Sequence, residues 1–321
     1  MSLMTWTNVV GTVYQNEELS KKVRVQSDKN TKLSALVSPA EDLFLGKKSG
    51  DSVALRLVGR ISDSGATALG EFTPVPYSTI PEYYLTATVS RYARAVAWTG
   101  SRQDLDRMNE KDKVVERLGE HHSRTVNTLI YNQLVSGRSF CYQPTTATAG
   151  TFKDDGTSAG APAAAMNLWH LQEVSKQLST RNTPFVDGNN YLSCINPTIK
   201  MNILMDTASG GFVDVKKYAP GGVEGVFKNE IGSVCNIRFF EDNSGDLVNG
   251  GASSAFGSGF LVGYDAIREV PVYPMHLRYN GNVGDDFGNQ QAICWQMMCT
   301  WKSIWNYTAH GQGGILHFAA A

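Results

Sequence analysis

The stretch DLDRMNEKDKVVERLGEHHSRTVNTLIYNQLVS, residues 104–136, contains the longest regular pattern in the chain. Its apolar side chains recur at steps of three and four, which predicts an amphipathic helix of about seven turns. The apolar face consists of Val115, Leu118, His122, Val126, Leu129, Ile130 and Leu134. The polar face consists of Lys111, Lys113, Glu116, Glu120, Arg124 and Asn127. Gly137 follows and is expected to end the helix.

A period of two precedes this helix. Val53, Leu55 and Leu57 alternate with a row that carries arginines, SDSG at 62–65 predicts a turn, and ATALGEFTPVP at 66–76 is expected to return. One row of this long hairpin is only thinly apolar, so we expect it to lie outside the core of its own domain. Tyr83–Trp98 is rich in Tyr, Thr, Val and Ala and predicts a second extended segment.

Residues 1–50 are mostly polar, with short apolar islands at Trp6, Val9 and Val10 and again at 43–45. These islands are too sparse to form a core, but they suit a segment that lies against another surface. We therefore predict an N-terminal arm that becomes ordered by contact.

The second half of the chain predicts a compact mixed region. Residues 143–165 are small and turn-forming, and indicate a flexible loop or a boundary. Beyond them the pattern predicts a helix at 166–178, a strand at 191–195 and a helix that begins at Asn196 and Pro197. Strand signals recur at 235–242 and 260–267. A long strand with one apolar face is expected from the row Ile293, Trp295, Met297, Cys299, Trp301 and Trp305.

Composition excludes several classes of protein. The 321 residues are 42% hydrophobic and 18% charged, which is typical of one large globular domain or two ordinary ones. The 29 basic and 30 acidic side chains nearly cancel, so a free-standing DNA-binding domain is not expected. No apolar run reaches the roughly 18 residues of a membrane helix, and the N-terminus lacks signal-peptide features. We expect a soluble protein without a cleaved signal or a membrane partner.

Cysteine and histidine patterns predict no metal site. The five cysteines are an odd number without CxxC spacing, which favours reduced thiols. Cys294 and Cys299 would point to opposite sides of a strand, and the adjacent His121 and His122 diverge on a helix. EDNSGD at 241–246 lacks the spacing of a calcium loop and indicates a turn.

Catalytic motifs are absent from the sequence, which has no GxSxG, GxxxxGK[ST], GxGxxG after a strand, or HExxH. We therefore predict no catalytic residue, cofactor or metal. Trp295, Trp301 and Trp305 allow an aromatic stacking platform, but their regular alternation favours the core face of a sheet.

Charged side chains of both signs are interspersed along the hairpin and the extended segment. Because the signs alternate, ion pairing between subunits explains them as well as phosphate binding does. The candidate intersubunit contacts are Arg56, Arg60, Asp63, Glu71, Arg91 and Arg94.

Several segments resemble the major capsid proteins of tailed bacteriophages, which have the Hong-Kong-97-type fold, and in particular the branch typified by the N-four phage. The resemblance covers about Val53 to Phe318. Its most specific parts are YLSCINPTIKMNILMD at 191–206, and NEIG followed by NIRF within 215–242. Asn229 and Asn236 stand where the family usually has glycine. The ending at 284–318 is similar to the family pattern, with Phe287 in place of Pro-Leu and Trp301–Lys302 nearest to its Trp-Lys pair. LVGRISDSGATALGEFTPVPY at 57–77 resembles the family's extended loop, and 99–137 its spine helix.

The resemblance implies an α+β subunit with four parts: an N-terminal arm at 1–50, an extended β-hairpin loop at 51–80, a peripheral domain with the spine helix at 81–165 and 266–321, and a mixed α/β axial domain at 166–265. Such subunits form hexamers and pentamers of a virion shell that encloses double-stranded DNA, and they assemble in the host cytoplasm. Portal and scaffolding or decoration proteins are further expected partners. Two alternatives stay open: another virion component, such as a tail or decoration protein, and a cytosolic enzyme or ligand-binding domain.

Overall fold

The computed structural model describes residues 33–38, 52–61, 68–75, 77–100, 110–157, 161–206, 230–242, 257–281, 283 and 289–321. The elements are η2 Leu33–Leu36, β1 Ser52–Val58, β2 Glu82–Thr88, β3 Ser90–Thr99, α3 Glu110–Ser136, β4 Phe140–Thr146, β5 Ala149–Lys153, α4 Leu168–Thr180, β6 Tyr191–Ile195, α5 Pro197–Met205, β7 Glu230–Val234, β8 Ile237–Glu241, β9 Gly257–Val262, β10 Ile267–Asn280, β11 Gln290–Ser303, α7 Tyr307–His310 and β12 Ile315–Ala320. The α+β class is confirmed.

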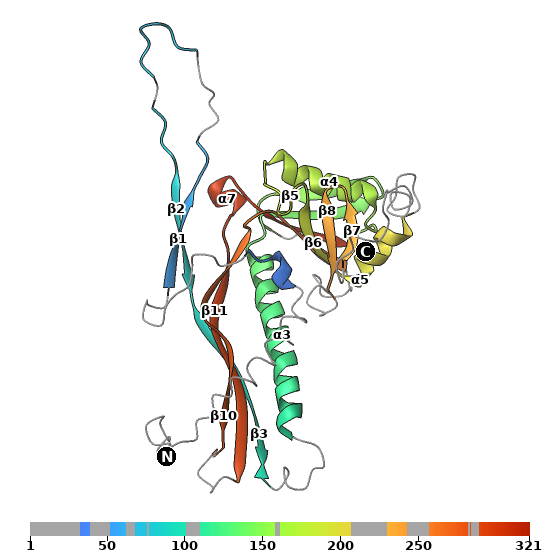
Figure 1. The fold of residues 1–321 in the computed structure, drawn as a ribbon. Coiled ribbons are helices and arrows are strands. Elements are labelled where there is room, and N and C mark those ends of the chain that lie inside the picture. Colours follow the sequence, from blue (N-terminus) through green and yellow to red (C-terminus); the bar gives the residue numbers. More distant parts are fainter. Residues whose placement is uncertain are drawn as a thin grey trace.

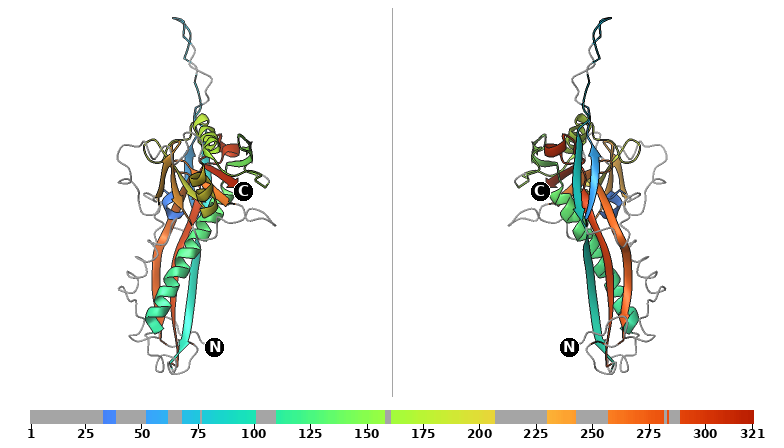
Figure 2. Two further views of the ribbon diagram at one scale, coloured as in Figure 1. Left: turned by 90° about the vertical axis from the view of Figure 1, so that its right-hand side faces the viewer. Right: turned by 90° about the vertical axis from the view of Figure 1, so that its left-hand side faces the viewer.

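A long shaft is formed by helix α3 and the three-stranded sheet β10-β11-β3 (Figure 1). β11 is the central strand and pairs antiparallel with both neighbours. Trp295 in β11 is 1% exposed, and it packs in the same cluster as Leu118, Ile130 and Leu134 of α3. The apolar residues of α3 that recur at steps of three and four therefore form the face that packs against the sheet, as predicted. Figure 2 shows how slender this shaft is from the side.

The limits of α3 follow from its sequence and packing. The expected helix is confirmed for 110–136, while 104–109 lie outside the described residues. Its last residue precedes Gly137, where a Cβ atom would lie 2.2 Å from that of Ser303. Asn127, which we expected on the polar face, is buried instead. Because α3 contacts η2 as well as β3 and β11, its buried face is wider than one sheet alone would make it.

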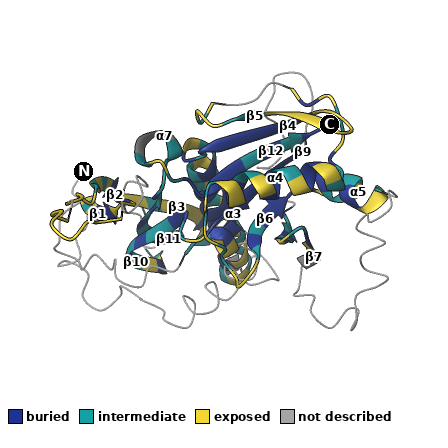
Figure 3. Cartoon of the chain, turned by 90° about the horizontal axis from the view of Figure 1, so that it is seen from above, coloured by how far each residue is buried: buried dark blue, intermediate teal, exposed yellow. Residues whose placement is uncertain are grey.

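A second sheet has the order β5-β4-β12-β9-β6-β8-β7 and lies at one end of the shaft. The pairs β12–β4 and β6–β8 are parallel and the others antiparallel. α4 packs its buried Leu171, Val174 and Leu178 into one core with this sheet (Figure 3). Phe260 and Ile315 join the shaft's core cluster, which connects the two parts.

Local signals explain the elements of this second part. Asn167 begins α4 by accepting a hydrogen bond from the His170 N–H at 3.1 Å, and Asn196 does the same for Ile199 at 2.9 Å before Pro197. The predicted strand at 191–195 and both helices are confirmed.

The tight connection between β7 and β8 accounts for one departure from the family pattern. Cys235 and Asn236 both have positive φ angles, 55° and 62°, as a two-residue type I′ hairpin requires. Asn236 stands where the family has glycine. Asparagine accepts this left-handed conformation more readily than most residues, so the turn is kept.

The second half of the chain departs from the expectations in several places. Residues 143–165 were expected to form a flexible loop or a boundary, but β4 and β5 form an antiparallel hairpin in part of this range, at the edge of the second sheet. Strand β12 was not predicted, and the strand signal at 260–267 belongs to two strands, β9 and β10. Trp305 does not continue the apolar row of β11, because the strand ends at Ser303 and Ile304 takes the buried position. Of the turn that was expected at 241–246, residues 243–246 lie outside the described residues.

Part of the predicted arm is firmly attached to the body. Leu33 and Leu36 of η2 are buried against α3 and β6, and the Ser38 N–H donates to the Ile267 carbonyl at 2.9 Å. The apolar islands that we singled out in the arm lie outside the described residues. Leu33, which begins the short apolar run LSALV at 33–37, is thus an anchor for its part of residues 1–50.

Leu33→Ala is expected to lower the free energy of unfolding by about 3 kcal/mol, since it removes a fully buried side chain and leaves a cavity. Urea denaturation followed by circular dichroism measures the loss. Leu69→Ala, at an exposed site, is the control and should change stability by less than about 0.5 kcal/mol. Equal effects of the two substitutions would show that η2 is not an anchor.

Two buried histidines make the stability of the fold depend on pH. Burial lowers the pKa of His122 and of His317 to about 4, with neighbouring His121 and Arg138 adding to the effect. In the unfolded chain both residues take up a proton near pH 6.5. The contribution of these two neutral histidines to the free energy of unfolding is therefore fully present above pH 6.5, and it is lost as pH falls from 6.5 toward 4. Burial raises the pKa of Glu269, which acts in the opposite direction, so the effect of one histidine is best isolated by substitution.

His122→Gln is expected to reduce the slope of unfolding free energy against pH, between pH 6.5 and 4, by about 1.4 kcal/mol per pH unit. Urea denaturation at a series of pH values measures this slope. Val126→Ala, on the same face of α3, is the control, because it should lower stability equally at every pH. An unchanged slope in His122→Gln would contradict the burial argument.

Candidate interaction surface

The β1–β2 ladder forms a stalk that carries a projecting loop (Figures 1 and 2). The ladder runs from the pair Ser52 and Thr88 to the pair Val58 and Glu82, and the Gly59 N–H donates to the Pro81 carbonyl at 2.8 Å. Within 60–80 the described residues contain no strand. We call residues 60–80 the extended loop. Its described residues project beyond the β1–β2 ladder, away from the rest of the subunit (Figure 1).

The return strand expected at 66–76 is absent from its described part, residues 68–75. In the structure the chain makes a turn in which Thr73 N–H donates to the Gly70 carbonyl at 3.0 Å, and the partner strand begins only at Glu82. Pro74, Pro76 and Pro81 have no N–H to donate to a ladder. The alternation of β1 is therefore paired with 82–88, and the loop is longer than the sequence indicated.

Exposed apolar side chains are concentrated on this loop and its stalk. Tyr77 is 100% exposed and Phe72 is 92% exposed. Large apolar side chains left in water usually mark a surface that another molecule covers. The other members of the group are Val58, Ile61, Leu69, Val75, Ile80 and Tyr84.

The lower end of the stalk is held by a small core of its own. Ala87 and Val89 are buried against Val270 and Val272 of β10, with Val53 packed beside them. Arg56 and Glu82 form an ion pair across the ladder. The stalk is thus a rigid support that fixes where the loop starts.

The candidate contact residues occupy different environments. Arg56 pairs with Glu82 of the same chain, Arg60 donates to the Asn182 carbonyl at 2.6 Å, and Arg91 donates to Gln296 Oε1 at 2.7 Å. Arg94 and Glu71 are exposed. Asp63 lies outside the described residues. The sequence did not identify these partners within the chain, because they are up to 205 positions away. Contact with another subunit stays a prediction for all six residues.

A second exposed apolar surface lies on α5. Met201, Leu204 and Met205 face outward at spacings of one helical turn, and Met205 is 66% exposed. Ile199 and Ile203 face the core. Figure 3 shows α5 at one end of the second sheet, away from the stalk. This patch gave no clear signal in the sequence, because Thr198, Lys200 and Asn202 alternate with the apolar residues and no separate polar face stands out.

The titratable side chains do not form a catalytic arrangement among the described residues. Cys141 Sγ lies 3.7 Å from His317 Nδ1, and the Tyr142 hydroxyl lies 2.7 Å from His170 Nδ1, but all four side chains are largely or fully buried. Burial raises the pKa of Tyr142 to about 12, so this hydroxyl stays protonated. A reacting substrate would have no access to either pair.

The described residues offer neither a metal site nor a membrane-spanning helix. The described ranges hold no group of three or more His, Cys, Asp or Glu side chains placed to bind one metal ion. All five cysteines are described, and none of them is in a disulfide. Among the helices that the structure describes, none is long and apolar enough to span a membrane. His121 and His122 instead pack their rings against Trp295, at 5.8 and 5.1 Å between centroids.

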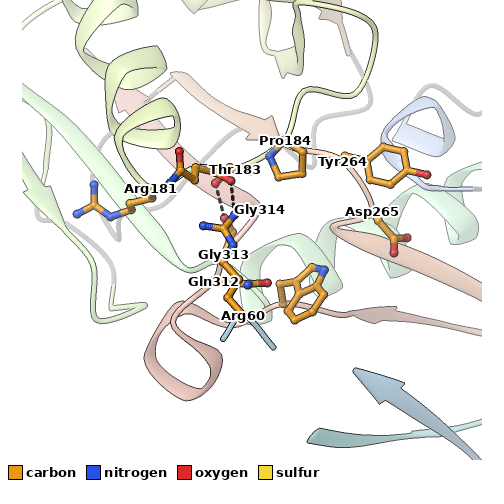
Figure 4. Close-up of a pocket in the computed structure, with 11 residues that line it drawn as sticks. Arg60, Arg181, Thr183, Pro184, Tyr264, Asp265, Gln312, Gly313 and Gly314 are labelled. Carbon is orange, nitrogen blue, oxygen red and sulfur yellow. Dashed lines mark hydrogen bonds between the residues drawn. The ribbon is translucent and has the colours of Figure 1, made fainter. Parts of the chain in front are cut away.

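A pocket of about 230 Å³ lies where the extended loop begins (Figure 4). Its wall includes Arg60, Asn182, Tyr264, Asp265 and Trp305. Asp265 is already paired with Arg268, at 2.6 Å from Oδ1 to Nε and 3.0 Å from Oδ2 to Nη2. The pocket therefore presents two arginines, Arg60 and Arg181, beside aromatic surface, without a nucleophile and base in contact.

Comparison with solved structures identifies the fold. No family model and no curated protein sequence matches the chain. The Cyanophage Pam1 capsid asymmetric unit aligns with 100% of this chain and 96% of its own, at 13% identity and a TM-score of 0.64. The capsid of Cyanophage P-SCSP1u aligns with 99% and 93%, at 13% identity and 0.64, and that of Ralstonia phage GP4 with 100% and 98%, at 11% identity and 0.63. The chain thus has the fold of phage capsid subunits, the Hong-Kong-97-type fold.

Proposed function

We propose that this chain is the major capsid protein of a tailed bacteriophage, and that it assembles with itself into hexamers and pentamers of an icosahedral shell around double-stranded DNA. The observation that carries the proposal is the extended loop. Phe72 and Tyr77 are exposed on a loop that a rigid stalk supports, and they are removed from water only when another subunit covers them. The capsid structures that this chain resembles span nearly its whole length, which favours a shell subunit over a tail or decoration protein.

Assembly by this loop is energetically reasonable. Burying Phe72 and Tyr77 removes roughly 150–250 Å² each from water, which is worth about 4–6 kcal/mol per side chain at about 25 cal/mol per Å². Much of this gain is offset by the loss of motion on association. Each contact is then modest and reversible, while closure of a shell makes many of them act together.

The division of the chain stays part of the proposal. The arm is 1–50, the extended hairpin 51–80, the peripheral domain 81–165 with 266–321, and the axial domain 166–265. β4, β5 and β12 come from the ranges assigned to the peripheral domain, yet they pair within the sheet of the axial domain. The polypeptide therefore passes between the two parts more than once.

Finer features are proposed on the sequence motifs alone. The match of NEIG and NIRF around the β7–β8 turn supports the N-four-like branch. Chemistry at a catalytic site is not part of the proposed function. Portal and scaffolding or decoration proteins are proposed partners of the shell, and the virion, after assembly in the host cytoplasm, is its proposed location. Arg94 and Glu71 are exposed and are the candidate charges for pairing with a neighbour.

Replacement of residues 60–80 by Asn-Gly is expected to leave a folded subunit that no longer forms shells. The stalk ladder ends at Gly59 and Pro81, and Asn-Gly suits a two-residue hairpin turn. Electron microscopy and sedimentation measure assembly, and circular dichroism measures folding. Normal shells from this folded variant would exclude the loop as the reaching element.

A milder variant separates apolar contact from chain length. Phe72→Ser with Tyr77→Ser should raise the protein concentration needed for assembly by at least about tenfold. Tyr264→Ser, which removes an exposed aromatic side chain outside the loop, is the matched control and should leave that concentration unchanged.

The purified subunit is expected to bind double-stranded DNA only weakly at physiological salt. The chain carries 29 basic and 30 acidic residues, and residues 1–50 hold seven basic against five acidic, so no strongly basic arm is present to release counterions. A gel-shift titration at 50 and 200 mM NaCl, with a basic DNA-binding protein as positive control, measures this. Tight binding with a steep salt dependence would revive a nucleic-acid-binding function.

A further inference from the structure

The upper end of the stalk contacts the segments that follow α4 and form α7 through two side chains. Arg60 Nη2 donates to the Asn182 carbonyl at 2.6 Å, and the ring of Tyr83 lies 4.6 Å from that of His310 in α7. Between them, Gly59 is the point where the chain leaves the ladder. A Cβ atom there would lie 2.8 Å from Pro81 Cγ and 3.0 Å from the Tyr83 ring, so the two sides of the stalk are close at this point.

The acceptor of Arg60 is a carbonyl that α4 prepares. The helix ends in a Schellman motif, in which the Asn182 N–H donates to Ser179 at 3.0 Å and the Thr183 N–H to Leu178 at 3.2 Å. Asn182 takes the left-handed conformation that the motif needs, with φ of 54°. The C-terminal end of a helix carries partial negative charge, so a guanidinium is a favourable partner for a carbonyl at this position.

The surroundings of Arg60 leave it room to move. It borders the pocket of about 230 Å³, in which Asp265 is paired with Arg268 and the Thr183 hydroxyl donates to the Gly313 carbonyl at 2.9 Å (Figure 4). Arg60 itself is exposed. Its contact is therefore a single charged hydrogen bond that opens without breaking any other, and we estimate that it favours the closed position about tenfold.

We infer that Arg60 is a latch, which fixes the direction in which the extended loop leaves its own subunit. The inference rests on the proposed function, because the direction of the loop has a consequence only when it reaches a neighbour. With the latch closed, every subunit presents its loop at the same angle, and the shell grows with one curvature. Without it, the loop turns about Gly59 and neighbouring subunits join at several angles. Arg60 is a positioning residue, in place of the intersubunit contact that its charge suggested.

Arg60→Ala, Arg60→Lys and Arg117→Ala test the latch. Arg117→Ala is the matched control, since it removes an exposed arginine whose ion pair with Glu120 stays within α3. Electron microscopy of assembled particles should show that Arg60→Ala raises the fraction of particles with an aberrant diameter at least about fivefold. Arg60→Lys, which keeps a positive donor, should lie near wild type, and Arg117→Ala should equal wild type.

A second measurement uses the unassembled full chain. Residue-resolved hydrogen exchange of the Asn182 and Thr183 amides should be about tenfold faster in Arg60→Ala than in wild type or Arg117→Ala, because the latch braces the end of α4. Unchanged exchange and unchanged diameters would overturn the latch while leaving the capsid proposal intact. Folded Arg60→Ala subunits that form no particles would also overturn it, since Arg60 would then be a contact that assembly requires. Failure of wild type to form shells would instead count against the proposed function.

Discussion

Burial of one face of α3 against β11 is the constraint on which the rest of the structure depends. The shaft has few layers, so a single helix must cover the apolar row that contains Trp295 and Met297. The same helix receives η2 on its surface, and its cluster extends into the second sheet through Phe260 and Ile315. Weakening this contact would loosen both parts of the subunit and the attachment of residues 33–38 together. It also explains why His122 is tolerated in the core, since its ring packs edge-on against Trp295 and is neutral there.

The surfaces that this core leaves exposed differ in kind, with an irregular edge strand in one place and exposed apolar side chains in two others. The edge strand β10 of the shaft sheet contains Pro271 and Pro274 and shifts its register near both, which makes edge-to-edge pairing along β10 unfavourable. Apolar exposure is instead concentrated on the extended loop and on α5, at separate places on the molecule. Two different patches, each unlike the other, suit head-to-tail contacts that close into rings.

Sequence reasoning succeeded where a periodic pattern was long. α3 and β11 have many residues that repeat one spacing, and the caps Asn167 and Asn196 are local signals, so these elements were predictable. β12 was not, because its residues ILHFAA are buried between two neighbouring strands and show no clear alternation. The partner of β1 was misassigned since a nearer segment looked extended, and the anchor Leu33 was missed because its apolar run, LSALV at 33–37, is short and follows a polar stretch. Arg60 gave a charge in the sequence but no hint of Asn182, because contacts across 122 positions depend on the whole fold.

The position of β12 has a consequence for the timing of synthesis. This strand lies between β4 and β9, yet it is encoded after every other strand of the sheet. While a ribosome is still translating the preceding segment, β4 and β9 have no neighbour on the side that faces the gap, and the sheet stays in two halves. A nascent chain therefore lacks a complete second sheet until β12 has been made. Only a chain translated through residue 320 completes the sheet, so the last of its strands to be synthesised is the one that joins its two halves.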